Sequence, residues 1–173
     1  LLKDNGKETL KNETFLKRKV LTPKLLWSGK IPAIENVCDD NAFVIIVEAV
    51  PTPKALNELW LESDNKAQLT NKIIEILASH HNAGLIQTDL HFGNFLFSDN
   101  KCYSLDGDAL LQFDKTPLSK AAENYALLIA QAEVINEEHF FNSLEHYCKL
   151  TKFNKADFQN IVEKQLIKTR KLR

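Results

Sequence analysis

Apolar positions at helical spacing dominate the chain after residue 51. The segment from Lys66 to His81 places its apolar residues on one helical face, and Gly84 soon after it suits the end of a helix. The same spacing predicts further helices in the stretches 121–132, 140–148 and 158–166. We expect the apolar faces of these helices to form the core of the protein.

The chain before residue 51 has a different pattern. KETLKNETFLKRKV has the spacing of a helix, whereas LTPKLLWSGK and AFVIIVEAV have the pattern of strands. The second strand is β-branched and continuously apolar, so we expect it to be buried. Two shorter strands, FLF and CYSL, are expected on either side of the turn-forming SDNK. The predicted class is α+β, with a strand-rich front and a helical back.

Composition narrows the range of functions. A chain of 173 residues with 44% hydrophobic content can build one sizeable core or two small lobes. Its net charge of -1 gives no electrostatic case for nucleic acid, so none is expected as a partner. Three scattered cysteines and the absence of a long apolar run favour a soluble, cytoplasmic protein. Because the sequence begins at Leu1 and contains no methionine, we expect it to be incomplete at its N-terminus.

Two carboxylates and a carboxamide stand at the ends of short apolar segments in GLIQTDLHFGNFLFSDNKCYSLDGD. They are Asp89, Asn94 and Asp106, and the predicted hairpin would bring all three to one edge. Oxygen ligands of this kind suit Mg²⁺, which completes its coordination with water and substrate phosphates. Phosphoryl transfer needs this combination, one Asp acting on the attacking hydroxyl and the others holding the metal. The alternative is ordinary turn chemistry, in which Asp and Asn cap turns.

These motifs resemble those of a known superfamily. DLHFGN followed by YSLDGD is similar to the D-x-x-x-x-N catalytic loop and metal-binding Asp of the protein-kinase-like fold. Together with HNAGLIQT and ENYALLIAQ they resemble, more closely, the bacterial lipopolysaccharide kinases, which phosphorylate Kdo or heptose sugars of the inner core. The resemblance covers the chain from Glu13 to Ala132. It implies an α+β, two-lobe fold: a partial N-terminal β lobe in residues 1–50, with a helix C and a hinge strand, and a mainly helical catalytic lobe in residues 51–173.

The resemblance also assigns the catalytic and metal-binding residues. Asp89 corresponds to the catalytic base, and His91 lies beside it, as in the DLHxGN loop of sugar and antibiotic kinases. Asn94 and Asp106 correspond to the Mg²⁺ ligands, with Asp108 assisting at the metal. The cofactors implied are ATP and Mg²⁺.

ATP contacts are implied at the front of the chain. The VEAV segment, with Glu48 and Val50, corresponds to the hinge whose backbone contacts adenine. Lys3, paired with Glu13, is the candidate for the lysine that grips the phosphates, although a solvated Lys and an exposed Glu explain these two residues equally well. The sequence shows no glycine-rich phosphate loop.

Departures from the protein kinases bear on the acceptor. Gln87 and Thr88 replace the His and Arg that precede the catalytic Asp, Gly107 and Asp108 follow the metal-binding Asp, and no A-P-E motif follows. A sugar or glycolipid acceptor is therefore favoured over a protein. The alternatives are a non-catalytic, pseudokinase-like binding module, or a kinase of another small alcohol or of a protein.

Two groups of basic residues have less specific interpretations. His80 and His81 end a predicted helix, where charge complementarity with the helix terminus explains them better than metal binding. The basic end KQLIKTRKLR is expected to be a solvated helix face, with peripheral contact to anionic lipid of the inner membrane of a Gram-negative bacterium as the alternative.

Overall fold

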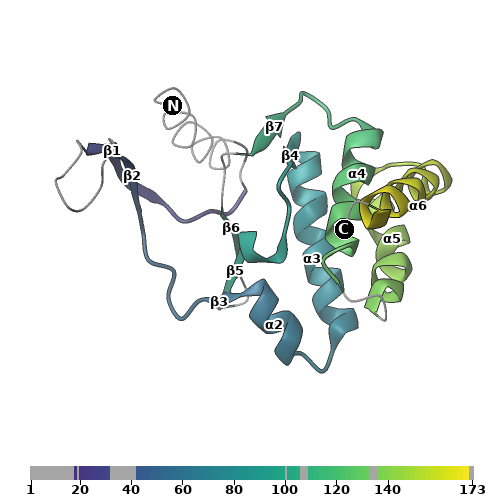
Figure 1. Ribbon diagram of the computed structural model, residues 1–173, viewed down its shortest axis with the longest axis horizontal. Coiled ribbons are helices and arrows are strands. Elements are labelled where there is room, and N and C mark those ends of the chain that lie inside the picture. Colours follow the sequence, from purple (N-terminus) through teal and green to yellow (C-terminus); the bar gives the residue numbers. More distant parts are fainter. Residues whose placement is uncertain are drawn as a thin grey trace.

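Strands lie both before and between the helices along the chain in the computed structural model (Figure 1), which describes residues 18, 20–31, 42–99, 101–105, 109–132 and 136–171. The elements are β1 (Leu25–Ile31), β2 (Ala42–Val47), β3 (Lys54–Ala55), α2 (Leu56–Glu62), α3 (Lys66–Asn82), β4 (Leu85–Gln87), the 3₁₀ turn η1 (Phe92–Asn94), β5 (Phe95–Ser98), β6 (Lys101–Ser104), β7 (Leu110–Gln112), α4 (Leu118–Ile129), α5 (Glu137–Thr151) and α6 (Lys155–Lys171).

The helices form the main core, as the sequence predicts. Helix α3 packs against α5, and α4 packs against α6. Fully buried aromatic rings join them: the centroid of the Tyr147 ring lies 4.9 Å from that of Tyr125 and 4.8 Å from that of Phe158. The Tyr125 hydroxyl donates to the Phe140 carbonyl oxygen at 2.8 Å, so this phenol is paired as well as buried. The predicted apolar face of α3 is buried throughout: Leu69, Ile73, Ile74, Leu77 and Ala78.

Two small antiparallel sheets lie against this core. Strands β3, β5 and β6 form one sheet, in which Phe95 pairs with Ser104 and Ser98 with Lys101. Strands β4 and β7 form the other, with Gln87 opposite Leu110. The β5–β6 hairpin confirms the strands predicted on either side of SDNK. Residues 88–94 connect the two sheets, so the loop that carries Asp89 is held at both ends.

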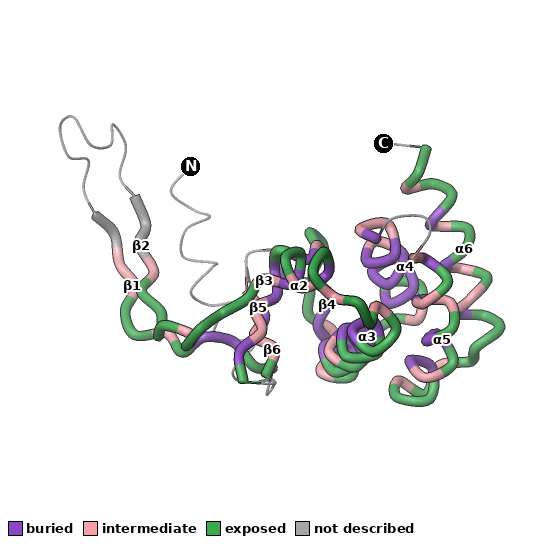
Figure 2. The backbone as a smooth tube through the Cα atoms, turned by 90° about the horizontal axis from the view of Figure 1, so that it is seen from below, coloured by how far each residue is buried: buried purple, intermediate pink, exposed green. Residues whose placement is uncertain are grey.

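The β1–β2 hairpin stands apart from the helices at the other end of the molecule (Figures 1 and 2). Both strands were predicted, but the expectation that the second is buried is wrong. Ile46 is 49% exposed and Val47 is 40% exposed, because β2 pairs with β1 and with no other strand in the described ranges. The helix predicted over 7–20 falls almost entirely outside the described residues. The division into lobes at residue 50 stays a prediction.

Gly84 ends helix α3 and starts strand β4. Its φ of +74° lies in the left-handed region, and a Cβ built on it would lie 2.0 Å from the Phe113 carbonyl oxygen. That close approach lets the Phe113 amide donate to the Gly84 carbonyl oxygen at 2.8 Å, which pins the end of β7 to the start of β4. The predicted helix stop at Gly84 is confirmed, and the strand pairing adds a second reason for glycine.

We expect Gly84→Ala to lower the free energy of unfolding by about 2 kcal/mol or more, since alanine meets both an unfavourable φ and a backbone oxygen. Chemical denaturation followed by circular dichroism measures the change. Gly93→Ala is the matched control: its Cβ would meet only the movable His91 ring, at 3.0 Å. Equal stability of Gly84→Ala and the parent protein would contradict this account of the turn.

Candidate active site

The loop between β4 and β5 carries three of the predicted site residues. Asp89 is exposed, His91 is half-buried immediately before η1, and Asn94 is buried at the end of η1. The Asn94 Nδ2 donates to the Asp89 carbonyl oxygen at 2.8 Å, and its backbone amide donates to the His91 carbonyl oxygen at 3.1 Å. These bonds fold the loop back on itself, as predicted from the spacing of Asp89 and Asn94.

Asn94 is suited to bind a cation through its side-chain oxygen. Because Nδ2 donates to the Asp89 carbonyl oxygen, the side-chain amide has a fixed orientation. Its Oδ1 is an oxygen ligand of the kind that Mg²⁺ takes. The residue type and its oriented amide are compatible with the predicted metal site, whose other members lie outside the described residues.

The remaining metal and phosphate residues lie outside the described ranges: Asp106, Asp108, Lys3 and Glu13. The neighbours of the 106–108 segment are described, however. The Leu105 amide donates to the Asn94 carbonyl oxygen at 2.8 Å, and the Ala109 carbonyl oxygen accepts from the Thr88 amide at 2.8 Å. Both ends of that segment are thus bonded to the loop that carries Asp89.

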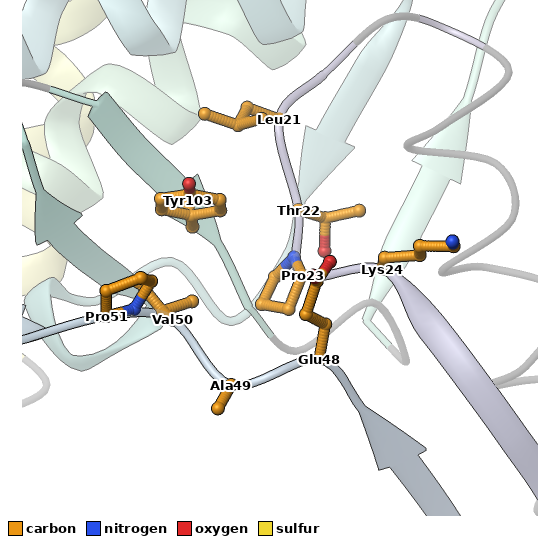
Figure 3. Close-up of a pocket in the computed structure, with 9 residues that line it drawn as sticks. All are labelled: Leu21, Thr22, Pro23, Lys24, Glu48, Ala49, Val50, Pro51 and Tyr103. Atoms are coloured by element: carbon orange, nitrogen blue, oxygen red, sulfur yellow. The ribbon is translucent and has the colours of Figure 1, made fainter.

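A pocket of about 400 Å³ lies at the predicted hinge (Figure 3). Glu48 and Val50, both predicted, line it on one side, and the Glu48 amide donates to the Lys24 carbonyl oxygen at 2.8 Å. The Tyr103 ring from β6 closes another side, above Val50 and Pro51 in Figure 3. The rest of the lining was not predicted from the sequence, and it comes from residues 21–24, Pro51 and Tyr103. The pattern of LTPK predicts a strand, but β1 begins only after this segment, whose proline interrupts regular structure. The position of Tyr103, three residues before Asp106, is the signal that could have identified it.

A chain of buried polar side chains links the helices to the catalytic loop. His81 Nε2 lies 3.0 Å from Asn124 Oδ1, and its Nδ1 is hydrogen-bonded to the Tyr147 hydroxyl. Asn124 Nδ2 donates to the Gln87 carbonyl oxygen at 2.7 Å, and Gln87 Nε2 donates to the Leu105 carbonyl oxygen at 2.9 Å. This network therefore holds the backbone directly before the Asp89 loop, at Gln87, and the backbone directly before Asp106, at Leu105.

The interpretation of His80 and His81 as charges at a helix end is wrong. Both side chains are buried, and His80 Nε2 lies 2.8 Å from the Ser104 hydroxyl. Burial lowers the pKa of His80 to about 3 and the pKa of His81 to about 4, so both are neutral near pH 7. Apolar spacing alone did not separate these two from exposed helix-end histidines.

Comparison with known proteins gives structural relatives only. No model of a protein family matches the chain, and no curated protein matches it. The structure of WaaP in complex with acyl carrier protein aligns with a TM-score of 0.63 and 17% identity, over 94% of this chain and 75% of that one. The bifunctional kinase-methyltransferase WbdD aligns with a TM-score of 0.53 and 13% identity, over 94% of this chain and 36% of that one. The fold of this chain is therefore similar to that of WaaP and to that of part of WbdD.

The observed structure agrees with the predicted class at the level of mixed helix and sheet. At 13% and 17% identity, the likeness carries no substrate and no residue role. Among the described residues, no helix has the length and apolarity needed to cross a membrane. The basic C-terminal end forms the last turn of α6, where Arg170 pairs with Glu137, and its contact with lipid stays a prediction.

We expect stability to fall as the pH drops from about 6.5 towards 4. In this window the unfolded chain protonates His80 and His81, whose ordinary pKa is 6.5, while the folded protein keeps them neutral. The unfolded state therefore binds more protons, and each histidine contributes a slope of up to about 1.4 kcal/mol per pH unit.

Urea denaturation at about pH 7.5 and about pH 5 measures this loss, and carboxylates contribute little across that range. His81→Gln should flatten the pH dependence. The control His146→Gln should not, because His146 lies on the surface beside Glu75, with 3.2 Å between Nε2 and Oε1. A pH-independent midpoint for the parent protein would contradict the neutral, buried assignment.

Proposed function

We propose that this protein is an ATP- and Mg²⁺-dependent kinase that transfers the γ-phosphate to a hydroxyl of a lipopolysaccharide inner-core sugar, Kdo or heptose. The observation that carries the proposal is the bonding of Leu105 to Asn94 and to Gln87. Leu105 follows β6, the strand that supplies Tyr103 to the hinge pocket. The hinge pocket and the folded-back Asp89 loop are therefore joined through one short strand, which supports the close approach of nucleotide and acceptor that phosphate transfer requires.

Each predicted residue has a role in this proposal. Asp89 accepts the proton of the acceptor hydroxyl, and His91 lies beside it to help position the acceptor. The hydroxyl oxygen bonds to the γ-phosphorus while the bond from that phosphorus to the bridging oxygen of ADP breaks. The products are a sugar phosphate, ADP and a proton on Asp89.

The nucleotide and the metal have separate sets of residues. The backbone at Glu48 and Val50 would contact adenine, and Lys3, held by Glu13, would bind phosphate. Asn94, Asp106 and Asp108 would hold Mg²⁺, which neutralises charge on the phosphates when it is bound. The oriented Asn94 amide supports this assignment, since the hydrogen bond of Nδ2 to the Asp89 carbonyl oxygen fixes its side chain beside the Asp89 loop.

The sugar acceptor is supported by a sequence motif, because the DLHFGN loop resembles that of sugar kinases. The kinase activity is supported by the similarity in fold to the bifunctional kinase-methyltransferase WbdD. A cytoplasmic location, with peripheral contact to the inner membrane through the basic end of α6, belongs to the same proposal. No role for nucleic acid is proposed.

A non-catalytic binding module is the second candidate. In its favour, the described part of the chain before residue 51 contains only the β1–β2 pair, whereas kinases cover the phosphates with a glycine-rich hairpin. Mg²⁺-dependent ATP binding without phosphate transfer to any sugar would favour this candidate over the kinase.

We expect Asp89→Asn to lower sugar phosphorylation by about 10²–10⁴-fold while ATP binding and the unfolding midpoint stay unchanged, because the amide cannot accept the proton. Transfer of labelled phosphate to deacylated core oligosaccharide measures the effect. Asp99→Asn is the control: Asp99 is an exposed aspartate in the turn after β5, at a φ of 47° that asparagine tolerates. Unchanged turnover of Asp89→Asn would remove Asp89 from the mechanism.

We expect Asp106→Ala to weaken Mg²⁺-dependent nucleotide binding more than Asp108→Ala does, since Asp106 is the direct ligand in this proposal. Titration calorimetry with ATP, with and without Mg²⁺, measures the difference. Asp114→Ala is the control, because Asp114 is an exposed aspartate beyond β7, and its Mg²⁺-dependent affinity for ATP should equal that of the parent protein. Equal Mg²⁺-dependent affinity in all variants would count against the metal site.

A further inference from the structure

A small hollow lies beside the catalytic loop, away from the hinge pocket. It encloses about 120 Å³, and its residues come from β4, β7, α4 and the start of the 88–94 loop. Its apolar lining consists of Ile86, Leu111 and Leu127. Its polar groups are Thr88, Lys120 and Glu123, together with the buried Asn124.

This hollow differs from those beside α3 because its lining includes a residue of the 88–94 loop. Thr88 lies in its wall, and Thr88 is the residue directly before Asp89, so the two Cα atoms are about 3.8 Å apart. The hollows beside α3 are lined by residues such as Lys72 and Phe97 and include no residue of the 88–94 loop. An acceptor hydroxyl must reach Asp89, so its binding site has to border this loop.

The hollow has groups that can bind a polyol. Lys120 Nζ and Glu123 Oε2 are 2.7 Å apart at the rim, and their side chains are 46% and 38% exposed. The ammonium group donates hydrogen bonds and the carboxylate accepts them, so together they can pair with neighbouring hydroxyls of one sugar ring. The apolar lining suits the C–H groups of that ring.

The ion pair of Lys120 and Glu123 favours a neutral sugar over an acidic one. Lys120 is already neutralised by Glu123, so an added carboxylate or phosphate would have to displace Glu123 or lie next to it. A neutral hydroxyl edge meets no such repulsion. The volume, about that of four water molecules in the liquid, fits a few hydroxyl groups rather than a whole oligosaccharide.

We propose that this hollow is the acceptor subsite and that it binds the neutral hydroxyl edge of a sugar ring through Lys120 and Glu123. This inference rests on the proposed kinase function for the chemistry that follows binding, and of the two acceptors proposed there it selects the neutral heptose over the acidic Kdo. Binding itself can be tested without turnover. Lys120 and Glu123 select and position the acceptor, while Asp89 remains the group that acts on the reacting hydroxyl.

The test is a titration of the full chain, labelled at its isoleucine and leucine methyl groups, followed by nuclear magnetic resonance. Methyl α-mannoside is the neutral probe, and Kdo and mannose 6-phosphate are the acidic ones, each added to about 50 mM to cover millimolar affinities. We expect the neutral probe to shift the methyls of Ile86, Leu111 and Leu127. The dissociation constants of the two acidic probes should be at least about fivefold higher.

Variants at the rim identify the groups responsible. Lys120→Gln and Glu123→Gln should each raise the dissociation constant of the neutral probe by about tenfold, since each loses a charge-assisted hydrogen bond. Lys149→Gln is the matched control, because Lys149 forms a similar surface ion pair with Glu145, at 2.8 Å, on helix α5. Its affinity for the probe should equal that of the parent protein.

Three results would overturn the subsite: no shift with any sugar, shifts confined to methyls elsewhere in the protein, or an acidic probe that binds as tightly as the neutral one. ATP and Mg²⁺ are titrated into the same sample. If ATP fails to bind while the mannoside shifts these methyls, the kinase proposal falls and the sugar site stands. If ATP binds and no sugar does, only the subsite falls.

Discussion

The buried imidazole of His81 determines how the helices meet the strand that leads into the catalytic loop. A neutral imidazole has one donor and one acceptor nitrogen. Asn124 Oδ1 can only accept, so Nε2 carries the proton and Nδ1 accepts from the Tyr147 hydroxyl. The three side chains come from α3, α4 and α5, and each uses its hydrogen-bonding groups inside the core. Leaving any of them unpaired there would cost about 1–3 kcal/mol, which makes this arrangement of the helices specific.

The same network extends to the backbone at Gln87 and Leu105, where directional hydrogen bonds fix the orientation of the carbonyl groups. Asn124 donates to the Gln87 carbonyl oxygen, and Gln87 donates to that of Leu105. Gln87 is thus buried and hydrogen-bonded, although the next two residues, Thr88 and Asp89, are exposed. The departure from protein kinases at Gln87, noted from the sequence, acquires a structural reason: its amide reaches across to the strand end before Asp106. These hydrogen bonds therefore couple the position of the loop to the packing of the helical core.

Periodic apolar segments were predictable because burial follows local spacing. The face of α3, the aromatic residues of α5 and α6 and the β5–β6 hairpin all agree with the sequence pattern. The folded-back loop from Asp89 to Asn94 was predicted from its motif. Two features were not predicted, because they depend on partners that are distant in the sequence. His81 contacts α4 and α5, whereas His80 contacts the β5–β6 hairpin. Strand β2 is exposed because β1 is the only strand that pairs with it in the described part of the chain, which no pattern within Ala42–Val47 reveals.

The Asp89 loop and the hinge pocket are held in place by different kinds of contact. Buried side chains, among them Asn124 and Gln87, form hydrogen bonds to the backbone beside the Asp89 loop. The hinge pocket instead lies between exposed segments, and backbone bonds such as that from the Ser104 amide to the Leu21 carbonyl oxygen, 2.8 Å, tie its front wall to β6. Few apolar contacts oppose local opening of such a region. A ligand that contacted Tyr103 and residues 48–50 together would add contacts across this pocket, and it would stabilise the protein by binding the folded form alone.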